Sequence, residues 1–169
     1  MPRTRTVPDA EILNLVCAQL AQTGEKSVTF ASISAQTGLA APTLVQRFGT
    51  RDAMQSAALG FAWDRLDRIT AEVEAEALTS VKGATAMLKA LSDAPETQLL
   101  TLSLRDEPLR ARAELWRSTV ETALAKRLGH GAKGQDLAAI VFAAWQGRLL
   151  WGPTGGKSFR LSDLLRRLA

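Results

Sequence analysis

The stretch TFASISAQTGLAAPTLVQRFGTRDAM, which spans residues 29–54, predicts two short helices joined by a tight turn and followed by the capped start of a third. Thr29 can cap the first helix by accepting a hydrogen bond from a free N–H of its opening turn. Gly38 can end that helix in the left-handed conformation, and Pro42 suits the opening turn of the next helix, where a missing N–H is no loss. This arrangement is typical of a helix-turn-helix.

The second helix of such a unit lies in the major groove when it binds DNA, and residues near its N-terminus contact base edges. Thr43 can hydrogen-bond a base and place its methyl group on thymine, whereas Gln46 can pair with adenine through two hydrogen bonds. Ala41 and Pro42 offer apolar contact. These residue types favour a surface that contacts bases.

The rest of this helix has other predicted roles. Leu44, Val45 and Phe48 form its apolar side, and Arg47 and Arg51 are better placed for phosphates. A helix, a glycine turn and a second helix also form a common packing unit. The pattern up to this point leaves that alternative open.

A longer pattern surrounds these positions. The pattern consists of a glycine, a small apolar residue, Thr-Leu, an aromatic residue and a basic turn into a long helix. Its members are Gly38, Leu39, Thr43, Leu44, Phe48, Gly49, Thr50, Arg51, Asp52 and Met54. Over about the first third of its length, the chain thereby resembles the tetracycline-repressor (TetR) family of transcriptional regulators. It departs from that family at Val45 and Arg47, where aromatic rings are common, and at Ala40, where serine often caps the helix.

The resemblance implies an all-α fold of about nine helices. Residues 1–55 would form a three-helix, helix-turn-helix DNA-binding head, and residues 56–169 a helical bundle for effector binding and dimerisation. The implied function is a ligand-responsive repressor that binds a palindromic operator in double-stranded DNA as a homodimer. The residues expected at the DNA are Arg3, Arg5, Thr29, Ala41, Pro42, Thr43, Gln46, Arg47 and Arg51.

The sequence has few residues suited to metal binding, disulfide formation or catalysis. Cys17 is the only cysteine and His130 the only histidine, so the sequence has no cysteine-rich zinc motif, no intrachain disulfide and no histidine pair for a metal or for catalysis. The GGKS run at residues 155–158 lacks the spacing of a phosphate-binding loop. We therefore expect no metal, no cofactor and no enzymatic activity.

Hydropathy argues against a membrane partner. The longest apolar run, residues 137–151, is interrupted by the Gln-Gly-Arg sequence at residues 146–148, so it is too short to span a bilayer. No apolar segment precedes Pro8, and a secretory signal is therefore not indicated. The expected location is the cytoplasm.

The distribution of charge leaves a second function open. The net charge is +4, but residues 1–55 carry five basic and four acidic side chains, whereas residues 126–169 carry eight and two. The positive surplus therefore does not lie in the expected DNA-binding head. Together with Val45 and Ala40, it favours the alternative of a TetR-like module that binds a ligand or a protein and has weak or no specific affinity for DNA.

Apolar periodicity predicts a first helix from Pro8 to Gly24 and, after the head, helices over residues 51–78, 80–91, 97–105, 109–128, 135–151 and 161–168. The helix over residues 135–151 is apolar on nearly all sides, and a chain of this size has difficulty covering such a helix. Members of the TetR family pack their last two long helices against the same pair in a second subunit. The resemblance therefore implies a homodimer through residues 135–168, with contacts from Phe142, Trp145, Leu149 and Leu165.

Apolar residues between these helices could line a cavity for a hydrophobic small-molecule effector, as the resemblance implies. They are Trp63, Met87, Leu91, Leu99, Leu102, Trp116 and Phe142. Gln98, Arg105 or Asp106 would supply polar contacts. Ordinary core packing is the alternative for each apolar member of this set.

Overall fold

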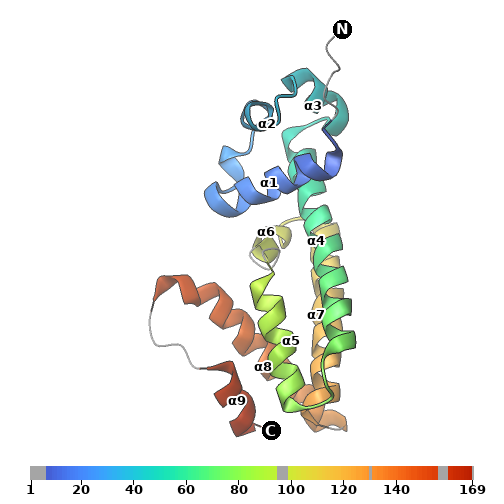
Figure 1. Ribbon diagram of the computed structural model, residues 1–169, viewed down its shortest axis with the longest axis vertical. Coiled ribbons are helices and arrows are strands. Elements are labelled where there is room, and N and C mark those ends of the chain that lie inside the picture. Colours follow the sequence, from blue (N-terminus) through green and yellow to red (C-terminus); the bar gives the residue numbers. More distant parts are fainter. Residues whose placement is uncertain (1–6, 95–98, 130, 156–159, 169) are drawn as a thin grey trace. The chain divides into compact units, whose positions relative to one another are not determined.

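The computed structural model describes residues 7–94, 99–129, 131–155 and 160–168, and every regular element in these ranges is helical (Figure 1). The elements are α1 (Asp9–Thr23), η1 (Glu25–Ser27), α2 (Phe30–Thr37), α3 (Ala41–Phe48), α4 (Arg51–Glu76), α5 (Val81–Asp93), α6 (Leu100–Ser103), α7 (Glu107–Leu128), α8 (Gly131–Trp151), η3 (Gly152–Thr154) and α9 (Leu161–Leu168). The predicted all-α fold is confirmed.

The chain divides into two compact units. The head unit comprises Met1–Arg65 and Leu99–Arg110, and the body unit comprises Leu66–Gln98 and Ala111–Ala169. Helices α4 and α7 therefore contribute residues to both units. The boundary expected at residue 55 separates a DNA-binding region from an effector-binding and dimerisation region, and it stays a prediction.

The predicted helix-turn-helix is present in the head unit. The Thr29 hydroxyl accepts a hydrogen bond from the Ser32 backbone N–H at 3.0 Å, and the Ser32 hydroxyl accepts one from the Thr29 N–H at 3.0 Å. This reciprocal pair satisfies donors that the first turn of α2 would otherwise leave without partners. Gly38 ends α2 with φ 73° and ψ 4°, the left-handed conformation that glycine adopts without strain. Pro42 lies in the first turn of α3, as predicted.

One apolar core holds α1 against the helix-turn-helix. The buried side chains are Ile12, Val16, Leu20, Val28, Ile33, Leu44, Met54 and Ala58. Those of α1 recur every four residues and so form one stripe on that helix. The Cys17 thiol donates to the Ala58 carbonyl at 3.1 Å, so this cysteine takes part in helix packing.

Residues 99–110 also belong to the head unit. The buried Trp63 indole N–H donates to the Ser103 hydroxyl at 2.9 Å, which joins α4 to α6. The Ser56 hydroxyl donates to the Asp106 carboxylate at 2.8 Å and supplies a second link. Hydrogen bonds therefore tie α6 to the helix that follows the helix-turn-helix.

The body unit is organised around an aromatic cluster. The ring centroid of Trp116 lies 5.9 Å from that of Phe142 and 6.1 Å from that of Trp145. The Trp145 indole N–H donates to the Ser92 hydroxyl at 2.8 Å, so α8 is fastened to α5. Aromatic pairs at such distances stabilise packing beyond the area that they bury.

A buried arginine closes the C-terminal end of α4. The Arg127 side chain donates from Nη2 to the carbonyl oxygens of Glu74, at 2.7 Å, and Ala77, at 3.0 Å. Its Nη1 donates to the Ala123 carbonyl in its own helix at 2.7 Å. The last carbonyls of a helix have no partner within the helix, so Arg127 acts as a cap supplied from α7.

One expected connection was wrong. The sequence predicted helices over residues 109–128 and 135–151 with a break between them, but α8 already begins at Gly131. The backbones of Gly129 and Gly134 approach so closely that a Cβ on Gly134 would lie 2.8 Å from the Gly129 carbonyl carbon. These two glycines therefore permit a tight junction of α7 and α8. His130 and residues 97–98, the start of the helix predicted over residues 97–105, lie outside the described residues.

Candidate functional site

Helix α3 presents its N-terminal residues and one side to solvent. Pro42 and Gln46 are exposed, whereas Ala41 and Thr43 are half-buried, and Leu44 is fully buried. The side chains that sequence reasoning expected at bases thus lie on the outer side or at its edge. These side chains can contact a partner as large as a DNA duplex without any rearrangement of the helix.

Val45 was expected on the apolar inner side of α3, and this was wrong. It is 44% exposed. Consecutive helical residues point about 100° apart, and in α3 the core side is occupied by Leu44, which is fully buried. The structure places Val45 beside Gln46 on the solvent side, where an apolar side chain can contact the methyl group of thymine.

Arg47, expected at a phosphate, is already engaged inside the head unit. Its Nη1 donates to the Val7 carbonyl oxygen at 2.6 Å and to the Asp9 carboxylate at 3.1 Å. Its side chain is 26% exposed. This contact joins the last turn of α3 to the start of α1.

The other residues expected to contact the DNA backbone are considered next, and those that the structure describes lie near the starts of helices. Arg51 opens α4 and pairs with Asp52 at 3.0 Å, and both side chains are exposed. Thr50 caps α4 by accepting from the Ala53 N–H at 3.1 Å. Thr29 is half-buried, and its hydroxyl oxygen is used by the α2 cap. Arg3 and Arg5 lie outside the described residues.

The residues expected to line an effector cavity fall in both units. Trp63, Leu99 and Leu102 lie in the head unit, and Met87, Leu91, Trp116 and Phe142 lie in the body unit. All of them are buried except Leu102, which is half-buried. Of this set, Trp116 borders a described hollow.

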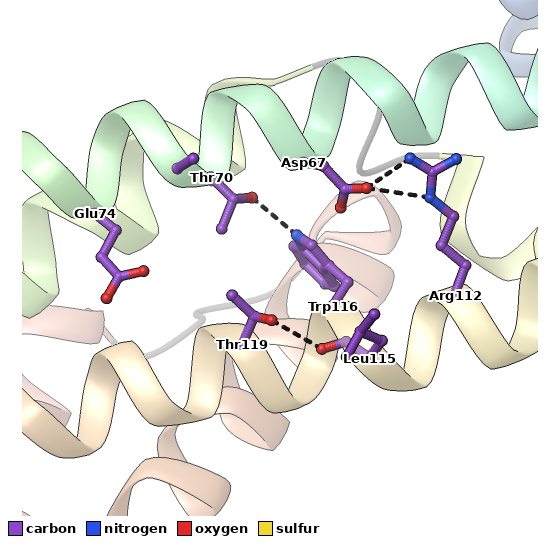
Figure 2. A pocket seen from close by; sticks show the side chains of 8 residues that line it. Asp67, Thr70, Glu74, Arg112, Leu115, Trp116 and Thr119 are labelled. Atoms are coloured by element: carbon purple, nitrogen blue, oxygen red, sulfur yellow. Dashed lines mark hydrogen bonds and ion pairs between the residues drawn. The ribbon is translucent and has the colours of Figure 1, made fainter.

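That hollow has a volume of about 260 Å³ and lies between α4 and α7 in the body unit (Figure 2). Its lining comes from one face of each helix: Asp67, Thr70, Ala71 and Glu74 from α4, and Arg112, Leu115, Trp116 and Thr119 from α7. In both helices the residues are spaced at three, four and seven positions, so each set forms one stripe.

Polar contacts fix the floor and one end of the hollow (Figure 2). The Trp116 indole N–H donates to the Thr70 hydroxyl at 2.9 Å, and Arg112 donates from two nitrogens to one Asp67 carboxylate oxygen at 2.6 and 3.1 Å. Beyond the opposite end, Lys126 pairs with Glu74 at 2.9 Å. The hollow is therefore bounded by α4–α7 ion pairs, and its apolar surface comes from Leu115, Trp116 and Ala71.

The residues expected at a dimer interface are largely covered within one chain. Trp145 and Leu165 are fully buried and Phe142 is 9% exposed, whereas Leu149 is half-buried. The exposed side of α8 instead carries Ile140, Ala143, Leu150 and Trp151. Ile140, Leu150 and Trp151 are 55%, 60% and 67% exposed. Sequence reasoning missed this stripe, although the spacing of 140, 143, 147, 150 and 151 places these residues on one helical face.

The described part of the chain contains neither a group of metal-ligating side chains nor a helix that could cross a membrane. No group of three or more His, Cys, Asp or Glu side chains there could hold a metal ion. Among the described helices, none is both long and apolar enough to cross a membrane.

Comparison with solved structures identifies the fold. The chain is similar to a TetR transcriptional regulator from Legionella pneumophila, with a TM-score of 0.65, 15% sequence identity and coverage of 99% of this chain and 97% of that chain. It is similar to a transcriptional regulator from Rhodococcus sp. Rha1, with a TM-score of 0.71, 19% identity and coverage of 96% and 94%. The multidrug binding protein EbrR, solved in complex with imidazole, gives a TM-score of 0.65 at 22% identity with coverage of 97% and 96%.

Comparison by sequence alone identifies no family for this chain. No protein-family model matches the chain, and no curated protein matches it significantly. The structural likeness extends over nearly the whole length of the chain and of the solved regulators. The chain therefore has the fold of the TetR-family transcriptional regulators.

Proposed function

We propose that this chain is a DNA-binding transcriptional regulator, a ligand-responsive repressor that binds a palindromic operator as a homodimer. The observation that carries the proposal is the outer side of α3. There Pro42, Val45 and Gln46 are exposed on the second helix of a capped helix-turn-helix. This is the helix that enters the major groove in proteins with this unit.

The chemistry of that side suits base recognition. Gln46 can donate and accept at the edge of adenine, and Thr43 and Val45 can contact the methyl group of thymine. Arg51 supplies a cation for the phosphate backbone, although it must exchange its contact with Asp52. Arg3 and Arg5 are proposed to contact DNA as well.

The homodimer is proposed to form through the exposed stripe of α8. Ile140, Leu150 and Trp151 are large apolar side chains whose exposure on one helical face is unfavourable in water. A two-fold contact that buries this stripe would pair two heads for the two halves of a palindrome. Leu149 lies on the inner side of α8 with Phe142 and Trp145, and these residues and Leu165 would support the face from inside.

DNA binding can be tested by fluorescence anisotropy with the intergenic DNA beside the gene. Wild type is compared with a Thr43→Ala, Gln46→Ala double variant and with Ser118→Ala, an exposed control in the body unit that does not line the hollow. Each lost base contact is expected to weaken binding by about 1–3 kcal/mol, with little change in the salt dependence. Equal affinity of wild type for this DNA and for a shuffled sequence would favour the alternative, a TetR-like module that binds a ligand or a protein.

We also propose a hydrophobic small-molecule effector that binds in the body unit against Trp116. The hollow bordered by that residue supports this site, and Met87, Leu91 and Phe142 would shape the wall behind it. Trp63, Leu99 and Leu102 stay predicted contacts in the head unit. The multidrug binding function named for EbrR is a precedent for an effector on this fold.

A thermal-shift screen with lipophilic compounds tests the effector site. Ala71→Phe should fill the hollow and abolish the stabilisation that a bound compound gives, because Ala71 lines it from α4. Ala75→Phe places the same ring on an exposed position of α4 that does not line the hollow, and should leave the shift unchanged. Compounds that stabilise wild type and both variants equally would place the effector elsewhere.

A further inference from the structure

The outer side of α3 is formed by uncharged side chains. Pro42, Val45 and Gln46 are exposed, and because successive helical residues turn by about 100°, all three lie within about 100° of arc around the helix axis. Leu44 points the other way, into the core of the head unit. The face that α3 offers to a partner therefore consists of a proline ring, a branched alkyl group and an amide.

The cationic side chain of α3 points away from this face. The structure describes α3 over its whole length, and its sequence APTLVQRF contains no acidic residue and a single basic one, Arg47. Arg47 is turned by about 140° from Pro42 around the helix axis. Its Nη1 donates to the Val7 carbonyl oxygen at 2.6 Å and to Asp9 Oδ1 at 3.1 Å, toward the start of α1. The outer face of α3 thus carries neither a cation nor an anion.

These residue types match one kind of base pair. In the major groove, guanine is read mainly by arginine or lysine and cytosine by glutamate or aspartate, and the outer face of α3 has none of these. Adenine is read by two hydrogen bonds from an amide such as that of Gln46, and thymine by apolar contact with its methyl group. Val45 and Pro42 supply apolar surface for that contact. Amide and alkyl groups on one face therefore complement A·T pairs.

The length of the face limits how many base pairs it reads. From Pro42 to Gln46 the helix rises by about 6 Å, at about 1.5 Å per residue. Successive base pairs are stacked about 3.4 Å apart. For a helix that follows the groove, the face covers about two to three base pairs in each half of a palindrome.

We propose that α3 reads A·T base pairs and that Val45 and Gln46 determine this preference. Val45 detects the methyl group of thymine, and Gln46 detects the N6 and N7 atoms of adenine. The inference rests on the proposed function as a DNA-binding regulator and names the class of sequence that is recognised. It depends on the 44% exposure of Val45, because a valine turned into the core could not touch a base.

Replacing thymine by uracil removes only the C5 methyl group and so tests the role of Val45. Sites are enriched by the purified protein from a pool of randomised DNA duplexes, and affinities are then measured with each thymine of an enriched site replaced in turn. Uracil at the contacted position should weaken binding by about fourfold, as expected for one methyl group that is no longer buried. Val45→Ala should bind both bases almost equally, whereas Val45→Ile should still prefer thymine.

The matched control for Val45→Ala is Leu104→Ala. Leu104 is an apolar side chain of similar exposure, 50%, and it lies in the head unit but outside α3. Its loss should leave the preference for thymine over uracil unchanged. A reduced preference in both variants would contradict a specific contact of Val45.

Gln46→Arg should change the specificity of binding, because arginine pairs with guanine through O6 and N7 as glutamine pairs with adenine. The sites enriched by this variant should carry G·C where wild type selects A·T, with a relative preference of about tenfold or more. Gln36→Arg adds the same charge at an exposed position of α2 and should leave the selected sequence unchanged.

The outcomes separate this inference from the function on which it rests. Specific binding that is insensitive to uracil at every thymine, or a Gln46→Arg variant that selects the wild-type site, would overturn the preference for A·T and leave the regulator function intact. If wild type enriches no sequence, the proposed function fails and the preference fails with it. Val45 and Gln46 are exposed, so circular dichroism of their variants should show an unchanged fold.

Discussion

Trp116 donates its indole N–H to the hydroxyl of Thr70 at 2.9 Å, and both side chains are buried where α7 packs on α4. The same hydroxyl donates to the Leu66 carbonyl at 2.7 Å. One threonine therefore links the tryptophan of the aromatic cluster to the backbone of α4. The hydroxyl matters because it acts as acceptor and donor together.

Thr70→Val should destabilise the protein by about 1–3 kcal/mol, because it keeps the shape of the side chain and removes the acceptor of a buried N–H. Urea unfolding followed by circular dichroism measures the change. The matched control is Thr119→Val, at an exposed position whose hydroxyl donates to the Leu115 carbonyl of its own helix. Equal effects of the two changes would show that the Trp116 contact is energetically unimportant.

Arg127→Met should be more harmful than Lys126→Met, although the two residues are neighbours. Arg127 is buried and bonds carbonyls at the end of α4, and its loss should cost about 1.5–3 kcal/mol. Lys126 makes an exposed ion pair with Glu74, and such pairs are worth about 0–1 kcal/mol. Equilibrium unfolding of both variants at low and high salt tests this difference. Only the Lys126 effect should fade with salt.

The helix-turn-helix could be predicted from the sequence because its signals are local. Thr29, Gly38 and Pro42 each act on the backbone within a few residues, and all three are found in the predicted roles. The contact of Arg47 with Val7 could not be predicted in this way. Its partners lie 40 residues apart in the chain, and no periodicity relates them.

The same reasoning explains the errors in α8 and α3. Apolar residues occur all round α8, so periodicity does not reveal that Trp145 faces inward and Ile140 outward. In α3, Leu44 and Val45 are adjacent, and only the packed structure shows which one enters the core. Hydropathy identifies residues that can be buried, whereas tertiary contacts decide which of them are.

Gly83→Ala should destabilise the body unit by about 1–3 kcal/mol, the usual cost of overpacking. A Cβ at this position would overlap the Leu78 carbonyl oxygen, which is backbone and cannot move aside as a flexible side chain does. Gly60→Ala is the control, because a Cβ there meets no atom within 4 Å and alanine favours a helix over glycine. Thermal unfolding should show opposite shifts. A neutral Gly83→Ala variant would mean that the turn between α4 and α5 relaxes easily.

Charge on the exposed stripe of α8 should separate the proposed dimer without unfolding the chain. In an Ile140→Asp, Leu150→Asp variant, two carboxylates from each subunit would have to be buried in the interface, which is strongly unfavourable. Both side chains are exposed in one chain, so the fold itself should tolerate the change. Size-exclusion chromatography with light scattering should give a dimer for wild type and a monomer for the variant, with unchanged circular dichroism.

Leu115→Asp is the matched control, because Leu115 is an equally exposed leucine, at 69%, on α7 rather than α8. It should leave the dimer intact. If it dissociates the dimer while the α8 variant does not, the interface lies on α7. If wild type is a monomer at micromolar concentration, the proposed two-headed binding to a palindrome loses its structural basis. A dimer that persists in the α8 variant would likewise assign the contact to another surface, because burying two unpaired carboxylates from each subunit costs several kcal/mol per ion.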